Sequence, residues 1–301
     1  MYFIDLERIK TYKTIQQNLF YFTPLSTIAN QQMTPIYKKI ISASRRIDMV
    51  GNAPDQFVDI LNKKCPPASV HTLVIWTKNA KNLFAYQPLL EKVKQYDQLF
   101  FHYTVTGMGG TMLEPRVPSA EKGITYLNDL VELAGDPRRI RFRFDPIVNL
   151  QLPDGTSYCN LTWFEKLAPK VKQSGVTDIS ISWMSEYRKV LSRLTRVGIT
   201  AMKVTPELWH CEYETIMEIA NKYNFSIHGC CVPQMSRSKC IDGELLKILH
   251  PTGEPCSTKK AKGQRSECGC TESWDIGWYH QCFHGCRYCY ANPEQISNDK
   301  S

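Results

Sequence analysis

The stretch "HTLVIWT", residues 71–77, is a short run of apolar and β-branched residues that ends on a polar one. Such a run predicts a buried strand. Similar runs occur at 39–44, 99–106, 140–145, 178–183 and 225–230. Amphipathic segments between the runs predict helices at 55–63, 86–96, 120–134, 161–173, 185–197 and 207–222. This alternation predicts an α/β fold with a parallel sheet and right-handed crossovers.

Two architectures fit the alternation: a partial (β/α)6 TIM-like barrel and an open doubly wound sheet. A dinucleotide-binding fold has little support, because no G-x-G-x-x-G follows the first strand. In both architectures a ligand binds at the carboxyl ends of the strands. The polar residues that gather there are the candidates for a catalytic role: Arg45, Arg46, Asp48, Lys78, Arg143, Asp145 and Tyr187. For each residue alone, a loop position or a helix N-cap is the simpler interpretation.

The overall composition is that of a folded protein, with 301 residues of which 43% are hydrophobic. Lys and Arg number 37 against 29 Asp and Glu, and the net charge of +8 favours anionic partners such as nucleic acid or phosphorylated metabolites. No apolar run reaches the roughly 18 residues of a membrane span, and the first 20 residues are too polar for a signal peptide. We therefore expect a cytoplasmic protein that does not enter membranes.

The distribution of the 12 cysteines indicates metal chemistry. Nine of them fall between Cys230 and Cys289, which scattered core thiols do not explain. Cys282, Cys286 and Cys289 have the spacing C-x3-C-x2-C, and three thiolates on one loop can bind three corners of a [4Fe–4S] cluster. Zinc remains an alternative, with His284 as the fourth ligand.

The stretch "CRYCYAN", 286–292, resembles the cluster loops of the radical S-adenosylmethionine (SAM) superfamily, including the spore photoproduct lyase branch. Tyr288 stands directly before the third cysteine, as an aromatic residue does there. The resemblance implies a [4Fe–4S] cluster whose open iron chelates SAM, and a reductant of the flavodoxin or ferredoxin kind. It further implies reductive cleavage of SAM to methionine and a 5′-deoxyadenosyl radical, which takes hydrogen from a substrate.

One feature departs from that superfamily: there the cluster loop follows the first strand, whereas here it comes last. SAM-binding positions therefore do not carry over by order. The loop that contains "GMGG", 107–110, offers a glycine-rich site for the SAM amine, although tight turns explain such glycines equally well. The residues expected to bind the cofactor are Thr106, Gly107, Gly109, Gly110, Glu114 and Tyr288.

A closer resemblance runs from about residue 40 to 293. The segments "IISASRRID", "VIWTKNAKNL", "TVTGMGGTMLEPRVP", "RFRFDPI", "KCIDGELL" and "GQRSECGCTESWDIGWYHQCFHGCRYCYAN" are together similar to the family named domain of unknown function 1848 (DUF1848). The resemblance implies a radical SAM-related chain with a C-terminal cluster motif. We divide the chain into an N-terminal extension (1–38), a (β/α)6-type barrel (39–230) and a Cys-rich segment on the barrel mouth (231–301).

The remaining cysteines of the C-terminal part form a second group. Cys230, Cys240, Cys268 and Cys270 are the expected ligands of an auxiliary [4Fe–4S] cluster or a zinc ion. Cys231 is nearly as good a choice as Cys230, and Cys256 is a weaker one. Buried thiols without metal are the alternative. Residues that fit a role in supporting the first cluster from outside its ligands are Ser273, Asp275 and Tyr279, and ordinary turn positions explain them equally well.

These observations predict a radical SAM-type enzyme acting on a small anionic metabolite or on nucleic acid. A non-catalytic nucleic-acid-binding module with a zinc or iron–sulfur site is the alternative.

Overall fold

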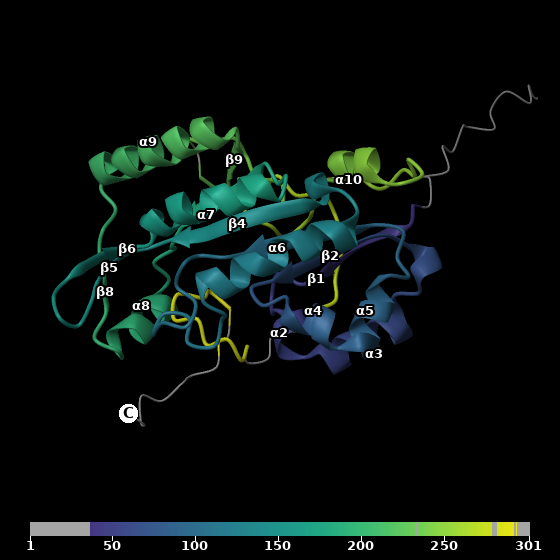
Figure 1. Cartoon of the computed structure of the whole chain (residues 1–301), viewed down its shortest axis with the longest axis horizontal. Helices are drawn as coiled ribbons and strands as arrows, with labels where there is room; N and C mark the ends of the chain where they lie inside the picture. The colour runs from purple at the N-terminus through teal and green to yellow at the C-terminus, as the bar shows by residue number, and fades with distance from the viewer. Residues whose placement is uncertain (1–36, 233, 279–281, 292, 294–301) are drawn as a thin grey trace, which may run out of the picture. The chain divides into compact units, whose positions relative to one another are not determined.

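The computed structural model describes residues 37–232, 234–278, 282–291 and 293, and residues from Tyr37 onward form one unit. Its main element is a seven-stranded sheet in which all neighbouring strands are parallel, in the order β10-β1-β2-β3-β4-β7-β9 (Figure 1). The strands are β1 (Lys39–Ala43), β2 (Val70–Thr77), β3 (Leu99–Thr104), β4 (Ile140–Ile147), β7 (Asp178–Trp183), β9 (Ser226–Gly229) and β10 (Trp274–Asp275). The predicted α/β class and the six predicted strands are confirmed. The expected N-terminal extension lies almost wholly outside the described residues.

The sheet is open. In the described part of the chain β9 and β10 form its two edges and do not pair with each other, so the sheet does not close into a TIM barrel. From β1 to β9 the strands lie side by side in chain order. A doubly wound sheet instead reverses its strand order at a switch point. The doubly wound alternative is therefore wrong for the described residues, and the sheet is wound in one direction.

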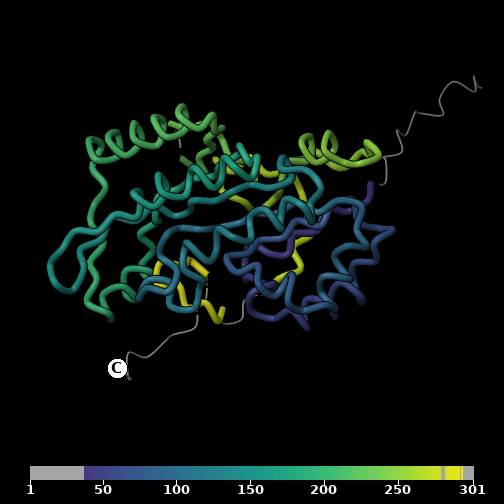
Figure 2. The backbone as a smooth tube through the Cα atoms, in the orientation of Figure 1, coloured from purple at the N-terminus to yellow at the C-terminus, as the bar shows by residue number. Residues whose placement is uncertain are grey.

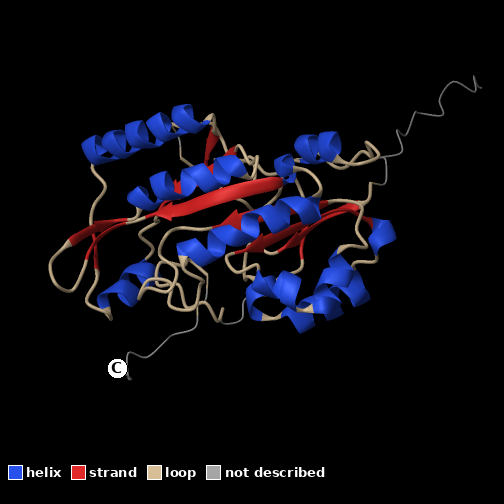
Figure 3. Cartoon of the chain, in the orientation of Figure 1, coloured by secondary structure: helices blue, strands red, loops and turns tan. Residues whose placement is uncertain are grey.

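Helices alternate with the strands and flank the sheet (Figure 3). They are α2 (Met49–Asn52), α3 (Pro54–Lys64), α4 (Lys81–Ala85), α5 (Gln87–Val93), α6 (Ala120–Ala134), α7 (Leu161–Gln173), α8 (Arg188–Thr195), α9 (Pro206–Tyr223) and α10 (Gly243–Leu249). Helix α6 has the predicted bounds because the sequence marks both its start and its end. Ser119 caps its start by accepting a hydrogen bond from the Lys122 amide, and Gly135 ends it with a left-handed φ of 75°.

The two faces of the sheet differ in chemistry. Ile41, Ile75 and Phe101 belong to the large core beneath the helices. The residues next to them point to the opposite face, since side chains alternate along a strand. On that second face Val74 and Phe100 are apolar, whereas the part formed by the end of β3 and by β4 is polar, with buried His102, Arg141 and Arg143. A sheet with both faces covered is usually apolar on both. The polar half therefore indicates a site.

The C-terminal part of the chain covers this second face. Ile241, Leu246 and Leu249 pack there with Val74 and Phe100. Strand β10 pairs with β1, and Figure 2 shows the yellow C-terminal segment beside the purple first strand. The predicted barrel segment and the predicted Cys-rich segment therefore contribute to the same sheet.

Several short elements were not expected from the sequence. They are α2, α4, α10, β10 and a small antiparallel sheet, whose strands are β5 (Asn149–Gln151), β6 (Ser157–Cys159) and β8 (Thr200–Ala201). Each is too short to show a period of its own, because tertiary contacts stabilise such elements. None of the described helices is long and apolar enough to span a membrane.

We predict that Leu246→Ala lowers the free energy of unfolding by about 2–5 kcal/mol, because Leu246 is 2% exposed and its truncation leaves a cavity under the C-terminal segment. Ile248→Ala is the matched control on the same helix, since Ile248 is 72% exposed and should change stability by less than about 0.5 kcal/mol. Denaturant titration measures both. Equal effects would mean that this segment does not pack as described.

Candidate functional site

A pocket of about 1180 Å³ lies at the carboxyl ends of the strands. Small-molecule pockets usually measure about 300–1,000 Å³, so this one has room for more than one ligand. All the predicted catalytic residues line it: Arg45, Arg46, Asp48, Lys78, Arg143, Asp145 and Tyr187. Both groups of cysteines line it as well: Cys282, Cys286 and Cys289, and Cys230, Cys231, Cys240, Cys268 and Cys270. The pocket thus brings together residues from both halves of the chain.

The cysteine loop, residues 282–291, is attached to the sheet by the buried carboxylate of Asp48. One carboxylate oxygen of Asp48 accepts hydrogen bonds from the Thr77 hydroxyl at 2.9 Å, the Lys78 amide at 2.8 Å and His284 Nε2 at 2.8 Å. The other accepts from the Gly51 amide at 2.8 Å and caps α2. One side chain therefore connects the end of β1, the end of β2 and the cysteine loop.

A second buried carboxylate, Glu114, holds the other part of the loop. Lys78 Nζ lies 2.9 Å from it, the Thr106 hydroxyl donates to it at 2.7 Å, and the Tyr288 hydroxyl donates to it as well. Burial raises the pKa of Glu114, but the charge of Lys78 and these hydrogen bonds outweigh burial and hold the pKa below its ordinary value. Glu114 is therefore ionised at neutral pH and paired with Lys78.

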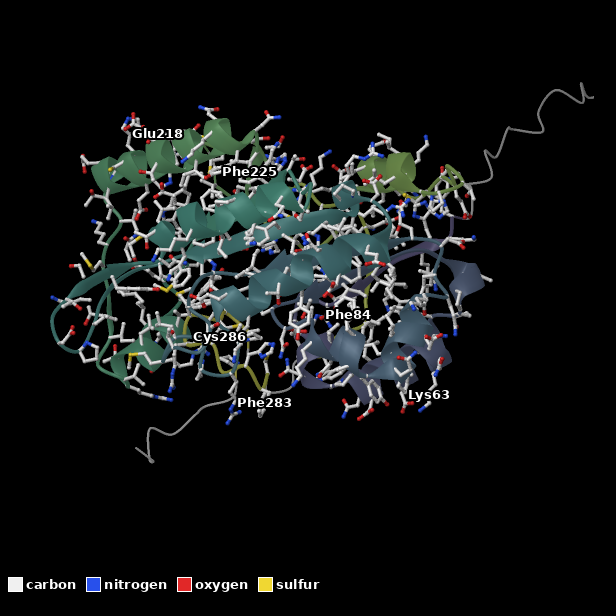
Figure 4. All side chains as sticks on the ribbon, in the orientation of Figure 1. Lys63, Phe84, Glu218, Phe225, Phe283 and Cys286 are labelled. Atoms are coloured by element: carbon white, nitrogen blue, oxygen red, sulfur yellow. The ribbon has the colours of Figure 1, made fainter. Side chains whose placement is uncertain are left out.

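Further contacts fix the ends of the loop. Asn52 Oδ1 accepts from the Phe283 amide at 2.5 Å, and Tyr290 donates to the Arg45 carbonyl at 3.1 Å. Arg193, on α8, donates to the Arg287 carbonyl at 3.1 Å and to the Cys289 carbonyl. Figure 4 labels Cys286, which lies inside the molecule, and Phe283, which lies at its edge. The loop is thus rigidly held with its thiols turned inward.

The thiols of the loop ionise to thiolates more readily when a cationic ligand is bound to them. Burial raises the pKa of Cys286 and Cys289, and it raises the pKa of Cys282 to about 11. Donors already reach two of the sulfurs: Asn52 Nδ2 lies 3.4 Å from the Cys282 sulfur, and the Ala291 amide lies 3.3 Å from the Cys289 sulfur. Such donors stabilise the ligated form of a thiolate. Three thiols that line one pocket, two of them with donors, fit a bound cationic centre.

Zinc and an iron–sulfur cluster make different demands on these thiols. Tetrahedral zinc with Zn–S bonds of about 2.3 Å brings its sulfurs within about 3.8 Å of one another. Within the described residues, no three cysteines have sulfur atoms that all lie within 4.8 Å of one another; the one ligand group that does is Asp97, His250 and Glu254. His284 Nε2 bonds to Asp48, while its Nδ1 is buried without a partner among the described residues, an arrangement that metal-binding histidines use. The loop therefore offers three thiols and one imidazole nitrogen as ligands.

The second group of thiols is centred on Cys240. Hydrogen bonds from the thiols of Cys230 and Cys270 are the main reason that the pKa of Cys240 lies well below its ordinary value, and Arg143 Nη1 lies 3.4 Å from the Cys240 sulfur. Cys256 is separate, since its thiol lies 3.2 Å from the Gly243 carbonyl and does not line the pocket.

The polar floor predicted from the strand ends is present. Arg143 is 9% exposed and forms an ion pair with Asp145, which also accepts from the Ser182 hydroxyl. The guanidinium of Arg143 lies 5.2 Å from the ring centre of Trp76. Each of these buried charges therefore has a partner, as burial requires.

Arg45 and Arg46 lie beside β10 and the residues on either side of it. Arg45 donates to the Ser273 hydroxyl at 3.3 Å and its amide donates to Asp275 at 3.2 Å, while Arg46 donates to the Gly277 carbonyl at 3.3 Å. Ser273 and Asp275 both contact Arg45, and their support of the cluster stays a prediction. Tyr279 lies outside the described residues.

Most residues expected to bind SAM lie beside the pocket rather than in its wall. Tyr288 lines the pocket, whereas Thr106, Gly107, Gly109, Gly110 and Glu114 are not among its lining residues. A Cβ on Gly107 would lie 2.1 Å from Trp163, and one on Gly109 would lie 1.8 Å from the Pro118 carbonyl oxygen. Both glycines thus serve close packing, and their role in cofactor binding stays a prediction.

Sequence reasoning missed several residues of the site. Asn52 and Arg193 hold the cysteine loop, while Trp209, Lys203 and Arg265 line the pocket. The rings of Trp183 and Trp209 lie 5.6 Å apart and form an aromatic wall. Each of these is a single residue on a separate element, so no sequence motif points to it.

Residues 49–291 match the family model described as Domain of unknown function (DUF1848). The chain belongs to this family. The resemblance expected from the sequence is confirmed at this level, and the match includes both cysteine groups.

Among solved structures, this DUF1848 chain is similar to the carboxyl transferase domain of Rhizobium etli pyruvate carboxylase with 3-bromopyruvate, at 11% identity and a TM-score of 0.25. The similarity covers 73% of this chain and 44% of that one, so the chain spans less than half of that structure. A search of curated proteins gave no match.

Loss of the Glu114 charge should be costly. We predict that Glu114→Gln lowers the free energy of unfolding at pH 7 by about 3–5 kcal/mol, because it leaves the buried Lys78 cation without its carboxylate. Glu218→Gln, at an exposed position on α9, should change stability by less than about 0.5 kcal/mol. Denaturant titration of both variants makes the comparison, and a small effect at Glu114 would argue against the buried pair.

Stability should also fall in acid. Burial raises the pKa of Asp48, but hydrogen bonds from His284, Gly51 and Lys78 bring it below its ordinary value, and the pKa of Glu114 is likewise depressed. Their stabilising effect is complete above the ordinary carboxyl pKa of about 4 and is lost as the pH falls through the lower folded-state values. The Asp48→Asn/Glu114→Gln variant should therefore lose less stability than the wild type between pH 5 and pH 3. Identical slopes would contradict this.

Proposed function

We propose that this protein is a radical SAM-type enzyme whose loop cysteines, Cys282, Cys286 and Cys289, ligate a [4Fe–4S] cluster with one open iron. When bound and reduced by one electron, such a cluster cleaves SAM into methionine and a 5′-deoxyadenosyl radical, which takes a hydrogen atom from a substrate. The electron would come from a flavodoxin- or ferredoxin-like protein. The partial-barrel interpretation of the sheet belongs to the same proposal.

The main support for the proposal is which strand of the sheet the cysteine loop follows, and not where the loop occurs along the chain. In the radical SAM superfamily the cluster loop follows the first strand. Here the loop follows β10, which lies at the edge of the sheet directly beside β1. In sheet order, the cysteine loop therefore follows the first of seven parallel strands. This arrangement supports a permuted form of the superfamily architecture and accounts for the late cysteines.

The surroundings of the loop suit this chemistry. The Cys286 thiol is buried and those of Cys282 and Cys289 are half-buried, which limits access of water to the reacting atoms. Lys78 and Arg193 lower the pKa values of nearby thiols, against the larger effect of burial, and Asn52 holds the first cysteine. The side chains of Asp48 and Glu114 hold the loop in one position. Three thiols that each bind a different iron of one cluster need such a fixed loop.

The rest of the pocket supports a substrate with an anionic group. Its lining includes the cationic side chains Arg45, Arg46, Lys78, Arg143, Lys203 and Arg265. Among the described residues, Arg45 Nε is buried without a hydrogen-bond partner, and a carboxylate or phosphate oxygen would satisfy it. In contrast to these cations, Trp183 and Trp209 form an apolar wall on which a planar ring can stack. An anionic metabolite and a nucleotide both have these features.

We predict that protein purified without oxygen, reduced with dithionite and mixed with SAM releases 5′-deoxyadenosine. Cys286→Ala should give no product above the enzyme-free background, because it removes a ligand of the cluster that cleaves SAM. Cys211→Ala is the control, since Cys211 is an exposed thiol outside the pocket and its loss should leave the yield unchanged. Liquid chromatography with mass detection measures the product.

Two outcomes would overturn the proposal. Equal yields of 5′-deoxyadenosine from the wild type and Cys286→Ala would show that the cysteine loop is not the site of SAM cleavage. Stoichiometric zinc without iron or acid-labile sulfide would favour the non-catalytic metal-binding alternative.

A further inference from the structure

The second group of thiols is a built site of its own on the polar face of the sheet. Three separate segments meet there: the end of β9 with Cys230, the segment around Cys240, and the "ECGC" segment with Cys268 and Cys270. All four thiols belong to the same packed cluster, and all four line the pocket. Neither Cys231 nor Cys256 meets both conditions, because Cys231 is outside the packed cluster and Cys256 is outside the pocket.

Backbone hydrogen bonds on either side of Cys240 bring these segments together. The Ser238 amide donates to the Gly229 carbonyl at 3.0 Å, which sets Cys240 beside Cys230. The Thr271 amide donates to the Ile241 carbonyl at 2.9 Å, which sets Cys240 beside Cys270. The position of the thiols therefore follows from the fold of the backbone and not from side-chain rotation alone.

The glycine between the two cysteines of "ECGC" serves this approach. A Cβ on Gly269 would lie 2.8 Å from Lys239 Cγ and 2.9 Å from Arg237 Cδ, so a larger residue would require these two side chains to shift. Gly269 thus lets the Cys268–Cys270 segment pack directly against the segment that leads to Cys240.

Cationic side chains surround the thiols. Arg143 Nη1 lies 3.4 Å from the Cys240 sulfur, and Arg265 Nη2 lies 4.0 Å from the Cys230 sulfur. A [4Fe–4S] cluster with four thiolate ligands has a net negative charge, and nearby donors and cations stabilise it. The Arg143 ion pair with Asp145 leaves its other amino group directed at the sulfur.

From these features we infer that Cys230, Cys240, Cys268 and Cys270 hold a second [4Fe–4S] cluster, in the wall of the pocket that also contains the cysteine loop. Zinc is the competing ligand of the same four thiols. The metal content of the protein separates the two. The inference does not depend on the cluster of the loop, since the two groups share no ligand.

Iron and acid-labile sulfide, measured per chain after anaerobic purification, test the inference. The wild type should contain about eight iron atoms and about eight sulfides, or two clusters. The variant Cys282→Ser/Cys286→Ser/Cys289→Ser should retain about four of each, with the Mössbauer spectrum of a four-thiolate cluster. The variant Cys240→Ser/Cys268→Ser/Cys270→Ser should also retain about four, but its reduced cluster should change its electron paramagnetic resonance signal when SAM is added.

Cys256→Ser is the matched control, because Cys256 packs in the same cluster of buried residues without lining the pocket. It should keep about eight iron atoms. The loop variant tests the second site while leaving its four cysteines intact, so a folding defect in the other triple variant does not decide the result.

The outcomes separate this inference from the proposed function. A wild type with about four iron atoms, all lost from the loop variant, would overturn the second cluster and leave the proposed function standing. About four irons that persist in the loop variant and disappear from the Cys240/Cys268/Cys270 variant would support the second cluster, whether or not the loop binds iron. Stoichiometric zinc retained in the loop variant would overturn the inference.

Discussion

The buried carboxylate of Asp48 is the interaction on which the arrangement of the site depends. It joins the residues after β1, the end of β2 and His284 of the cysteine loop. A buried carboxylate is stable only when donors surround it, so the three segments have to meet at this point. Glu114 repeats the principle with Lys78 and Tyr288. Two buried anions therefore hold a loop from the C-terminal end of the chain against strands formed near its start.

This arrangement explains how one pocket collects residues so distant in sequence. The carboxyl ends of parallel strands meet at one edge of a sheet, and β10 places the last cysteines at the same edge. The polar half of the second sheet face supplies Arg143 and Asp145, and the C-terminal segment covers it. The covering of the sheet by the end of the chain thus brings both thiol groups to the strand ends that carry Arg143 and Asp145.

Much of the scaffold could be predicted from the sequence, because long periodic segments such as 120–134 carry their own caps and faces. The polar strand ends were also predictable, since a parallel sheet brings them together. The role of Glu114 was not predictable, because its partners Lys78 and Tyr288 are 36 and 174 positions away. Strand β10 could not be predicted either, because two residues show no strand pattern and their pairing depends on the presence of β1.

The central claim is that the three thiols of the cysteine loop hold a cluster whose open iron chelates SAM. Electron–nuclear double resonance of the reduced protein with SAM labelled with nitrogen-15 at its amino group tests this most directly. The account predicts a hyperfine coupling between the label and the cluster, which disappears in Cys286→Ala. A reduced iron signal that is the same with and without labelled SAM would contradict it.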